Sequence, residues 1–307
     1  MDTLVEVENL TRRFGARIAV DRLGLSVRAG DVLGLLGPNG AGKSTTMRML
    51  SGCLAPTSGQ IRIDGIDLLR RPRAAKARIG YLPERPPLYR ELTVDEYLSY
   101  AARLRGTPAH EVPDRLRRVR QRCGLGAAGR RLVGNLSKGY QQRVGIAQAL
   151  VHAPAVVILD EPTAGLDPIQ IREVRELIAD IGRECAVLLS THILPEVQAV
   201  CTRAVIIHHG RLVYSEALQP GDGAGPAAVV IALERPPDLT EIQALAGVRR
   251  AERLRDGRFR LELEPEAGRG AAVAEQITAC GWGLIELAPQ RPGIEQTFVE
   301  LTAGEAA

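Results

Sequence analysis

A glycine-rich loop between an apolar run and a helical pattern is the feature that most constrains this chain. Residues 32–36 predict a buried strand, residues 44–51 predict a helix, and residues 37–44 fit the pattern G-x-x-x-x-G-K-[ST]. Glycines let backbone N–H groups converge on phosphate oxygens, and the helix presents its positive N-terminus to the same anion. The loop therefore predicts a nucleotide-phosphate site, in which Lys43 reaches the β- and γ-phosphates and the Ser44 hydroxyl ligates Mg²⁺.

A second apolar run ends in two acidic residues. Residues 156–159 predict a buried strand, and Asp160 and Glu161 follow it directly. We expect Asp160 to hold Mg²⁺ through water, and Glu161 to accept a hydrogen bond from the attacking water and take its proton. The alternative, that the two acids cap a helix N-terminus, is weakened by the phosphate loop upstream.

The order of apolar runs predicts a doubly wound α/β sheet. Residues 155–159 and 186–189 are continuously apolar, which suits parallel strands buried on both faces. Residues 4–8, 18–20 and 23–27 predict three short strands, and residues 205–213, interrupted by His209 and Gly210, predict a closing hairpin. A helical insertion begins near residue 93. It contains an arginine cluster that is either a solvated helix face or a docking or lipid-headgroup surface: Arg115, Arg117, Arg118, Arg120 and Arg122.

Composition and charge limit the classes of function that the chain can have. The 307-residue chain has a net charge of +4, but no compact basic stripe with interleaved aromatics, so we expect no nucleic-acid partner. Its five cysteines are scattered without metal-ligand spacing, which indicates a reducing compartment. The N-terminus does not have the pattern of a signal peptide. The longest uncharged apolar run, about residues 227–233, is far shorter than the roughly 20 residues that span a bilayer, so another chain would supply any membrane span.

A second, smaller domain is predicted at the C-terminus. Proline and glycine dominate residues 219–226, so we place a linker at 218–226 between a domain at 1–217 and one at 227–307. Strand-like runs at 228–233, 248–254, 259–263 and 284–287 alternate with helical runs at 239–245 and 271–280. The resulting βαββαβ order is the ferredoxin-like arrangement. A further helix is predicted at 294–301.

Residues 136–143, L-S-K-G-Y-Q-Q-R, resemble the LSGGQ signature of ABC ATPases. Ser137 and Gly139 fit this signature, whereas Lys138 and Tyr140 depart from it. Residues 164–167 are similar to the loop that links the two sites of an ABC dimer, and residues 190–192 to the family's switch-histidine segment, with the histidine at His192. The resemblance covers residues 1 to about 217. It implies a P-loop NTPase cassette of the ABC type, with a mixed sheet and a helical subdomain at about 93–150, followed by the small α+β ferredoxin-like domain.

The resemblance also implies the site residues and ligands, which are ATP and Mg²⁺. Catalysis would rest on Glu161, His192 and Lys43, and the metal on Ser44, Asp160 and Glu84. Glu84 falls where the family usually has the Q-loop glutamine, and we hypothesise that this carboxylate retains coupling with an altered Mg²⁺ dependence. The expected nucleotide-binding residues are Phe14, Gly37, Pro38, Asn39, Gly40, Ala41, Gly42, Lys43, Ser44, Thr45, Ser137 and Gly139. Phe14 would stack on adenine; a core phenylalanine is the alternative.

By resemblance, the chain is an ATP-hydrolysing subunit that dimerises with a second copy or a paralogue around two Mg-ATP. It would power a separate integral-membrane permease from the cytoplasmic face of the cell (inner) membrane. The best likeness is to ABC-2-type exporters, including gliding-motility-like and multidrug-efflux members. Two alternatives stay open: a soluble ABC ATPase that remodels a ribosome or DNA factor, and a non-hydrolysing regulatory module. One phosphate loop without heptad repeats argues against the first, and the intact catalytic set against the second.

Overall fold

The structure is a computed structural model that describes residues 2–218, 228–254, 257–264 and 271–290, and the single positions 294, 298 and 301. The chain divides into two units, Met1–Leu218 and Gln219–Ala307, and each is described by itself. Apart from Leu218, the predicted linker lies outside the described residues, as does most of the predicted helix at 294–301. No helix in the described part of the chain is both long and apolar enough to cross a membrane.

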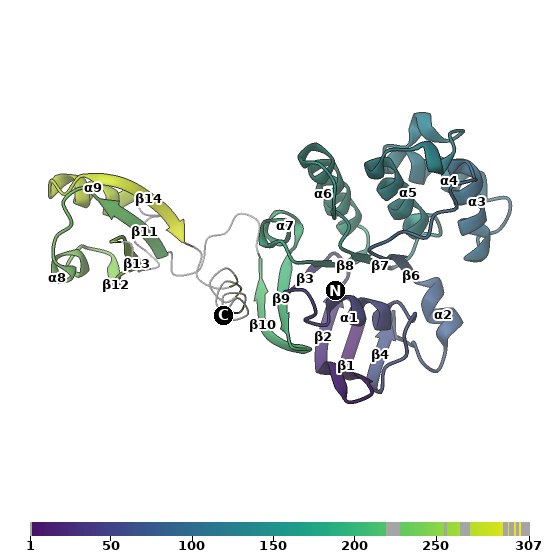
Figure 1. Ribbon diagram of the computed structural model, residues 1–307, viewed down its shortest axis with the longest axis horizontal. Helices are drawn as coiled ribbons and strands as arrows, with labels where there is room; N and C mark the ends of the chain where they lie inside the picture. Colours follow the sequence, from purple (N-terminus) through teal and green to yellow (C-terminus); the bar gives the residue numbers. More distant parts are fainter. Residues whose placement is uncertain are drawn as a thin grey trace. The chain divides into compact units, whose positions relative to one another are not determined.

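A six-stranded mixed sheet forms the centre of the first unit (Figure 1). Its order is β10-β9-β3-β8-β7-β6, in which β9, β3, β8, β7 and β6 run parallel and β10 pairs antiparallel with β9. Every residue of β3, β7 and β8 is buried, as expected for parallel strands covered on both faces. The strands are β3 (Val32–Leu36), β6 (Ile79–Leu82), β7 (Val156–Asp160), β8 (Ala186–Thr191), β9 (Arg203–His208) and β10 (Arg211–Ala217).

Alternate residues of this sheet pack into different layers. Leu33, Ile158 and Leu188 share one core with α1 (Lys43–Leu50) and with an antiparallel sheet ordered β2-β1-β4-β5. The opposite face is covered by α6 (Pro168–Gly182) and α7 (Leu194–Val200), and Figure 1 shows the strands nearly edge-on between these layers. A Cβ on Gly34 would lie 2.9 Å from Val197, so the absence of a side chain lets α7 rest directly on β3.

The antiparallel sheet differs from its prediction at one point. It consists of β1 (Thr3–Phe14), β2 (Arg17–Arg28), β4 (Ser58–Ile63) and β5 (Ile66–Asp67). The two short strands predicted at 18–20 and 23–27 are one continuous strand, β2. Arg22 adopts a left-handed conformation, with φ of 48°, where the β1–β2 register shifts, and this irregularity lets the strand continue through the interruption in its pattern.

The helical insertion contains α3 (Val94–Leu104), α4 (Val112–Arg122) and α5 (Lys138–Leu150), and α2 (Pro72–Ala77) precedes it. A capping box begins α3: Thr93 N–H donates to Glu96 Oε2 at 2.8 Å, and Glu96 N–H donates to Thr93 Oγ1. Four of the five arginines in the cluster on α4 form ion pairs within the chain. These pairs are Arg115–Glu111, Arg117–Asp114, Arg120–Asp95, Arg122–Asp180 and Arg122–Glu184. Arg120 and Arg122 therefore link α4 to α3 and α6, while Arg115 and Arg117 pair with acidic residues at the start of α4 itself.

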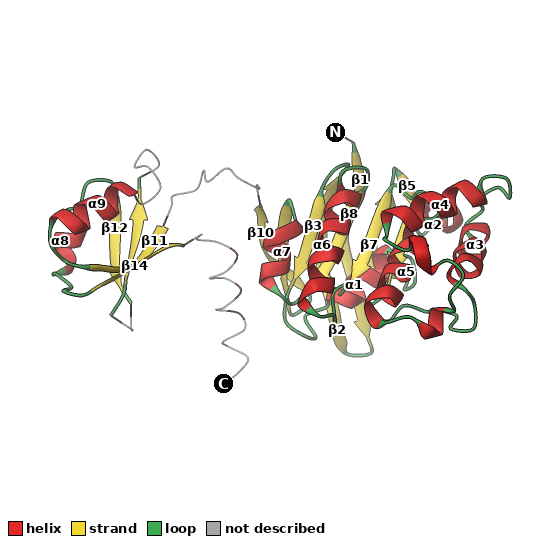
Figure 2. Ribbon diagram, turned by 90° about the horizontal axis from the view of Figure 1, so that it is seen from above, coloured by secondary structure: helices red, strands yellow, loops and turns green. Residues whose placement is uncertain are grey.

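The second unit has the predicted ferredoxin-like order. Its sheet, β12-β13-β11-β14, is antiparallel throughout, and the two helices connect strands that are not adjacent in it (Figure 2). Phe259 is fully buried in its core, and Trp282 packs against the same core. The elements are β11 (Ala228–Leu233), α8 (Leu239–Gln243), β12 (Val248–Arg253), β13 (Phe259–Leu263), α9 (Ala271–Ala279) and β14 (Leu284–Gln290).

Phe259→Ala should destabilise the second unit by about 3–5 kcal/mol, because it removes the ring and leaves a cavity in a small core. Trp282 is the single tryptophan of the chain, so its fluorescence during urea unfolding reports this unit. We expect the midpoint of the Trp282 transition to fall, while ATP affinity, a property of the first unit, serves as the control. An unchanged midpoint would show that Phe259 is not central to this core.

Candidate active site

The candidate site lies at the carboxyl edge of the parallel sheet. The phosphate loop follows β3, His192 follows β8, Glu161 follows β7, and Glu84 lies two residues beyond β6. Since β3, β8, β7 and β6 are consecutive in the sheet, loops from distant parts of the sequence meet along one edge. In open α/β sheets ligands bind at this edge.

The phosphate loop has the backbone geometry of an anion site. Gly42 caps α1 with φ of 109°, a conformation that L side chains rarely adopt, and a Cβ there would lie 2.5 Å from the Ala19 carbonyl oxygen. The cap supplies no side-chain hydrogen bond, and the first turn of α1 contains no acidic residue. The first N–H groups of the helix are therefore available to an anion, as nucleotide phosphate requires.

Lys43 lies inside this loop and is almost fully buried. Its Nζ donates to the carbonyl oxygens of Gly37 at 2.8 Å and Pro38 at 3.1 Å, and it lies 3.8 Å from Glu161 Oε1. Burial lowers the pKa of Lys43 below its ordinary value, and the nearby carboxylates oppose this shift. A multiply charged anion would stabilise this desolvated ammonium group more than the neutral carbonyl oxygens do.

Asp160 binds two hydroxyl groups. Ser190 Oγ donates to Asp160 Oδ1 at 2.5 Å, and Ser44 Oγ donates to the same oxygen at 3.2 Å. Burial raises the pKa of Asp160, although the two hydroxyls oppose the shift. The Ser44 hydroxyl and the Asp160 carboxylate therefore form an adjacent pair of oxygen ligands of the kind that Mg²⁺ uses together with substrate phosphates. Among the described residues, no group of three or more His, Cys, Asp or Glu side chains is arranged to hold a metal ion.

Glu161 and His192 form a contact pair. His192 Nδ1 lies 3.1 Å from Glu161 Oε1 and 3.0 Å from Oε2. Glu161 has a positive φ of 49°, a conformation that costs an ordinary residue about 1–3 kcal/mol and that often marks functional sites. Its N–H donates to the carbonyl oxygen and the hydroxyl of Ser190, both at 3.1 Å, so neighbouring β8 holds this strained backbone.

A cavity of about 500 Å³ opens over these groups, within the size range of small-ligand sites. Phe14 stands at its wall with 45% of its surface exposed, and the Arg12 guanidinium carbon lies 4.5 Å from the ring centroid. Phe14 is therefore not a core residue. The cavity is lined by Phe14, Arg17, Ala19, Asn39, Gly40, Gly42, Lys43, Ser44, Thr45, Glu84, Glu161, Ala164 and His192.

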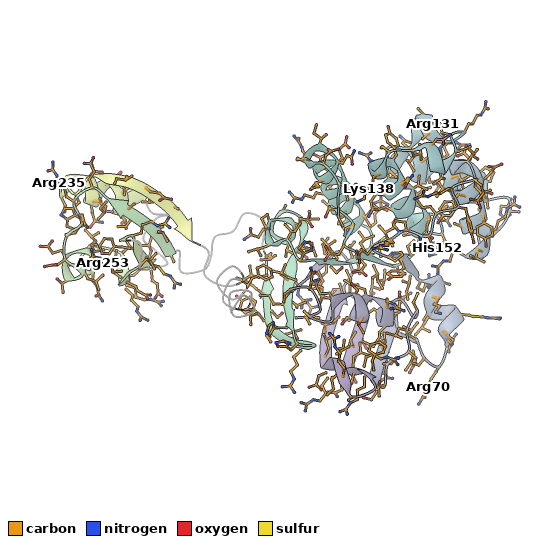
Figure 3. All side chains as sticks on the ribbon, in the orientation of Figure 1. Arg70, Arg131, Lys138, His152, Arg235 and Arg253 are labelled. Carbon is orange, nitrogen blue, oxygen red and sulfur yellow. The ribbon has the colours of Figure 1, made fainter. Side chains whose placement is uncertain are left out.

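The signature residues Ser137 and Gly139 do not line this cavity. Ser137 caps α5 and its Oγ accepts from the Tyr140 N–H, while Gly139 packs against Gln170. Lys138, which departs from the signature, is the first residue of α5 (labelled in Figure 3), and its amine would clash with a side chain on Gly165. The first turn of α5 contains no acidic residue, and Ser137 and Lys138 are exposed.

Three polar residues around the site were missed in the sequence. Ser190 holds Asp160 and Glu161, Gln142 Nε2 donates to the Pro162 carbonyl oxygen at 2.7 Å, and Glu196 binds two threonine hydroxyls. Ser190 lies in the switch-histidine segment, but its partners on β7 are fixed only by strand pairing. Gln142 lies in the signature-like segment 136–143, but its partner at Pro162 is not predictable from that segment, and nothing in the sequence pattern marks Glu196.

The fold and this site define an ATP-binding cassette of the ABC type. The ABC transporter family model matches residues 20–164. Bacitracin transport ATP-binding protein BcrA of Bacillus licheniformis is 42% identical over 214 residues, 69% of this chain and 69% of that protein. The uncharacterized ABC transporter ATP-binding protein YdbJ of Bacillus subtilis is 32% identical over 98% of this chain and 96% of its own length. The solved structure of an ATP-binding subunit of an ABC transporter matches with a TM-score of 0.64 and 35% identity, over 70% of this chain and 90% of that one.

The chain therefore belongs to the ABC transporter ATP-binding proteins. It is an ATPase subunit, and its hydrolysis of ATP is coupled to transport.

Asp160→Asn should stabilise the nucleotide-free chain at about pH 7. Because the folded chain holds the Asp160 proton more tightly than the unfolded chain, the ionised group costs stability as pH rises through the unfolded and then the folded pKa. Removing this cost should raise the Tm at neutral pH. The gain should vanish in acid, where Asp160 is protonated. Calorimetry without nucleotide or Mg²⁺ tests this, and a lower Tm at neutral pH would contradict it.

Proposed function

We propose that this chain is the ATPase of an ABC-2-type exporter, closing with a second copy or a paralogue around two Mg-ATP and driving a separate membrane permease. The observation that carries this proposal is the division of the phosphate-binding parts. The cavity is lined by part of the phosphate loop, by Glu84 and by the Glu161–His192 pair, and Asp160 reaches it through its hydrogen bond to Ser44. The start of the signature helix at Ser137 lies outside the cavity. A second chain brings the missing signature to each cavity.

ATP binds with its phosphates on the loop at residues 37–44. Lys43 Nζ exchanges the carbonyl oxygens of Gly37 and Pro38 for β- and γ-phosphate oxygens, which relieves its desolvation. The N–H groups at the start of α1 bind the same phosphates, with Thr45 beside them in the cavity wall. Phe14 stacks on adenine through its exposed ring face, and Arg12 holds the ring in place.

The metal ligands are Ser44, Asp160 and Glu84. When bound by these residues, Mg²⁺ would supply positive charge that offsets the charge of the nucleotide phosphates. Ser44 and Asp160 already share a hydrogen bond, and the Glu84 carboxylate lies close enough to raise the pKa of Asp160 and oppose the lowering of the Lys43 pKa. A metal bound between these carboxylates would relieve that repulsion. Glu84→Gln removes one charge, so an unchanged Mg²⁺ dependence of ATPase activity would reject Glu84 as a ligand.

Glu161 is the general base. Its carboxylate accepts a hydrogen bond from the attacking water and takes its proton. An ionised carboxylate can only accept, so His192 Nδ1 carries the proton in the contact between the two side chains. His192 thereby fixes the direction of the base, and in the doubly protonated imidazolium form its Nε2–H can also donate to the γ-phosphate. Catalysis is mostly positioning and charge stabilisation.

The dimer closes because each γ-phosphate binds both chains. Lys43 of one copy holds it from the phosphate loop, and Ser137 and Gly139 of the second copy bring the N-terminus of α5. Ala164 lines the cavity and Gly165 lies next to Lys138 at the start of the signature helix, which supports a role of the 164–167 loop in linking the two sites. Hydrolysis removes the bridge, and the loosened dimer transmits its opening to the permease, which docks near Glu84 and the helical insertion on the cytoplasmic face of the membrane.

Glu161→Gln should lower kcat by about 10²–10³-fold, because the amide cannot accept the proton of the attacking water. ATP should still bind, since the phosphate loop and Lys43 are unchanged, and the unhydrolysed γ-phosphate should hold the dimer together. Size exclusion of this variant with ATP and Mg²⁺ should show a dimer that disappears when ATP is omitted. A monomer under both conditions would count against the shared site.

Affinity purification of this chain from detergent-solubilised membranes of its native cell tests the transporter assignment. Recovery of a multi-helix membrane protein would support it and identify the cargo class; the name of the bacitracin transport relative makes bacitracin the first cargo to assay. Recovery of ribosomal or DNA-associated partners alone would contradict it and favour a soluble remodelling ATPase.

A further inference from the structure

Glu196, in the first turn of α7, is a buried carboxylate with no role in the reaction as described so far. Only 2% of its surface is exposed. Its two oxygens bind two different segments: Oε1 accepts from Thr163 Oγ1 at 2.6 Å, and Oε2 accepts from Thr191 Oγ1 at 2.7 Å. Both threonines are themselves buried, with exposed fractions of 5% and 0%.

The two threonines belong to the segments that carry the catalytic pair. Thr163 lies two residues after Glu161, and Thr191 immediately precedes His192. The Thr191 hydroxyl also accepts from the Ile193 N–H at 3.1 Å, so it fixes the backbone on both sides of His192. One carboxylate therefore spans the loop that presents the base and the loop that presents the histidine.

The chemistry of this position favours a carboxylate over an apolar residue. A buried carboxylate is costly unless each oxygen is hydrogen-bonded, and here two short charge-assisted bonds and the positive N-terminus of α7 offset that cost. Charge-assisted bonds are stronger and more directional than bonds between neutral groups. An apolar side chain would fill the same space without fixing the distance between the two loops.

We propose that Glu196 is a positioning residue, which sets the distance and orientation of the Glu161–His192 pair through Thr163 and Thr191. The proposal rests on the roles assigned above to Glu161 and His192. Glu196 does not line the nucleotide cavity, so it acts on the chemical step and not on ATP binding. Its loss should therefore appear in kcat and leave KM nearly unchanged.

The test is a double-mutant cycle on the ATPase activity of the full chain. Glu196→Ala should lower kcat about 10- to 100-fold, the scale expected when a catalytic group is misplaced, with KM changed less than about twofold. In a His192→Ala background the same substitution should lower kcat less than about threefold, because the pair that Glu196 positions is already broken. An equal loss in both backgrounds would overturn the proposal, as would an unchanged kcat.

Two further variants separate positioning from general damage. Glu196→Gln is nearly isosteric, and its single carbonyl oxygen still accepts from one threonine, so we expect a smaller loss of kcat; it replaces Glu196→Ala in the cycle if the latter does not fold. Val197→Ala is the matched control. Val197 follows Glu196 in α7 and is fully buried, but its side chain cannot hydrogen-bond to either threonine. It should lower Tm and leave kcat unchanged. A loss of kcat from Val197→Ala as large as that from Glu196→Ala would overturn the proposal.

Glu161→Gln separates failure of the assignment of Glu161 as the base from failure of the positioning role of Glu196. If it retains full activity, the assignment of Glu161 as the base fails whatever the Glu196 variants do. If it is inactive while the Glu196 cycle is additive, the base stands and the positioning role of Glu196 fails.

Discussion

The site depends on the burial of Lys43 beside carboxylates at one edge of a parallel sheet. Lys43 Nζ lies 3.8 Å from Glu161 Oε1 and donates to two backbone carbonyl oxygens. Burial raises the pKa of the neighbouring Asp160. Each of these charges is partly desolvated and incompletely compensated within the chain. Bound phosphate and its metal complete the compensation, which makes nucleotide binding the state that this arrangement favours.

Strand order and hydroxyl groups maintain these charges in place. The strand order β3-β8-β7-β6 places the phosphate loop, His192, Glu161 and Glu84 along one edge of the sheet. Hydroxyls then bind the carboxylates individually, with Ser190 on Asp160 and the threonines at 163 and 191 on Glu196. The strained backbone at Glu161 is held by strand β8. Precision at the reacting groups thus comes from pairwise contacts between neighbouring loops.

Much of this architecture was predictable because it is encoded locally. Strands at 32–36 and 155–159 are continuous apolar runs since both faces are buried, and the alternation of strands and helices predicted the ferredoxin-like unit. What escaped prediction depends on residues distant in sequence. Arg122 finds its carboxylates on α6 and just after it, and Glu196 joins two loops that only the sheet brings together. No periodicity or motif records such contacts. The continuity of β2 through Arg22 depends likewise on its pairing with β1.

Mixing two inactive variants tests the central claim, that each nucleotide is gripped by two chains. Lys43→Ala and Ser137→Ala should each abolish ATPase activity alone. In a mixed dimer both lesions fall in one site and leave the other intact, so an equal mixture should recover roughly a quarter of the wild-type activity, since roughly half of the dimers are mixed. A mixture as inactive as its components would contradict the shared site and place catalysis within a single chain.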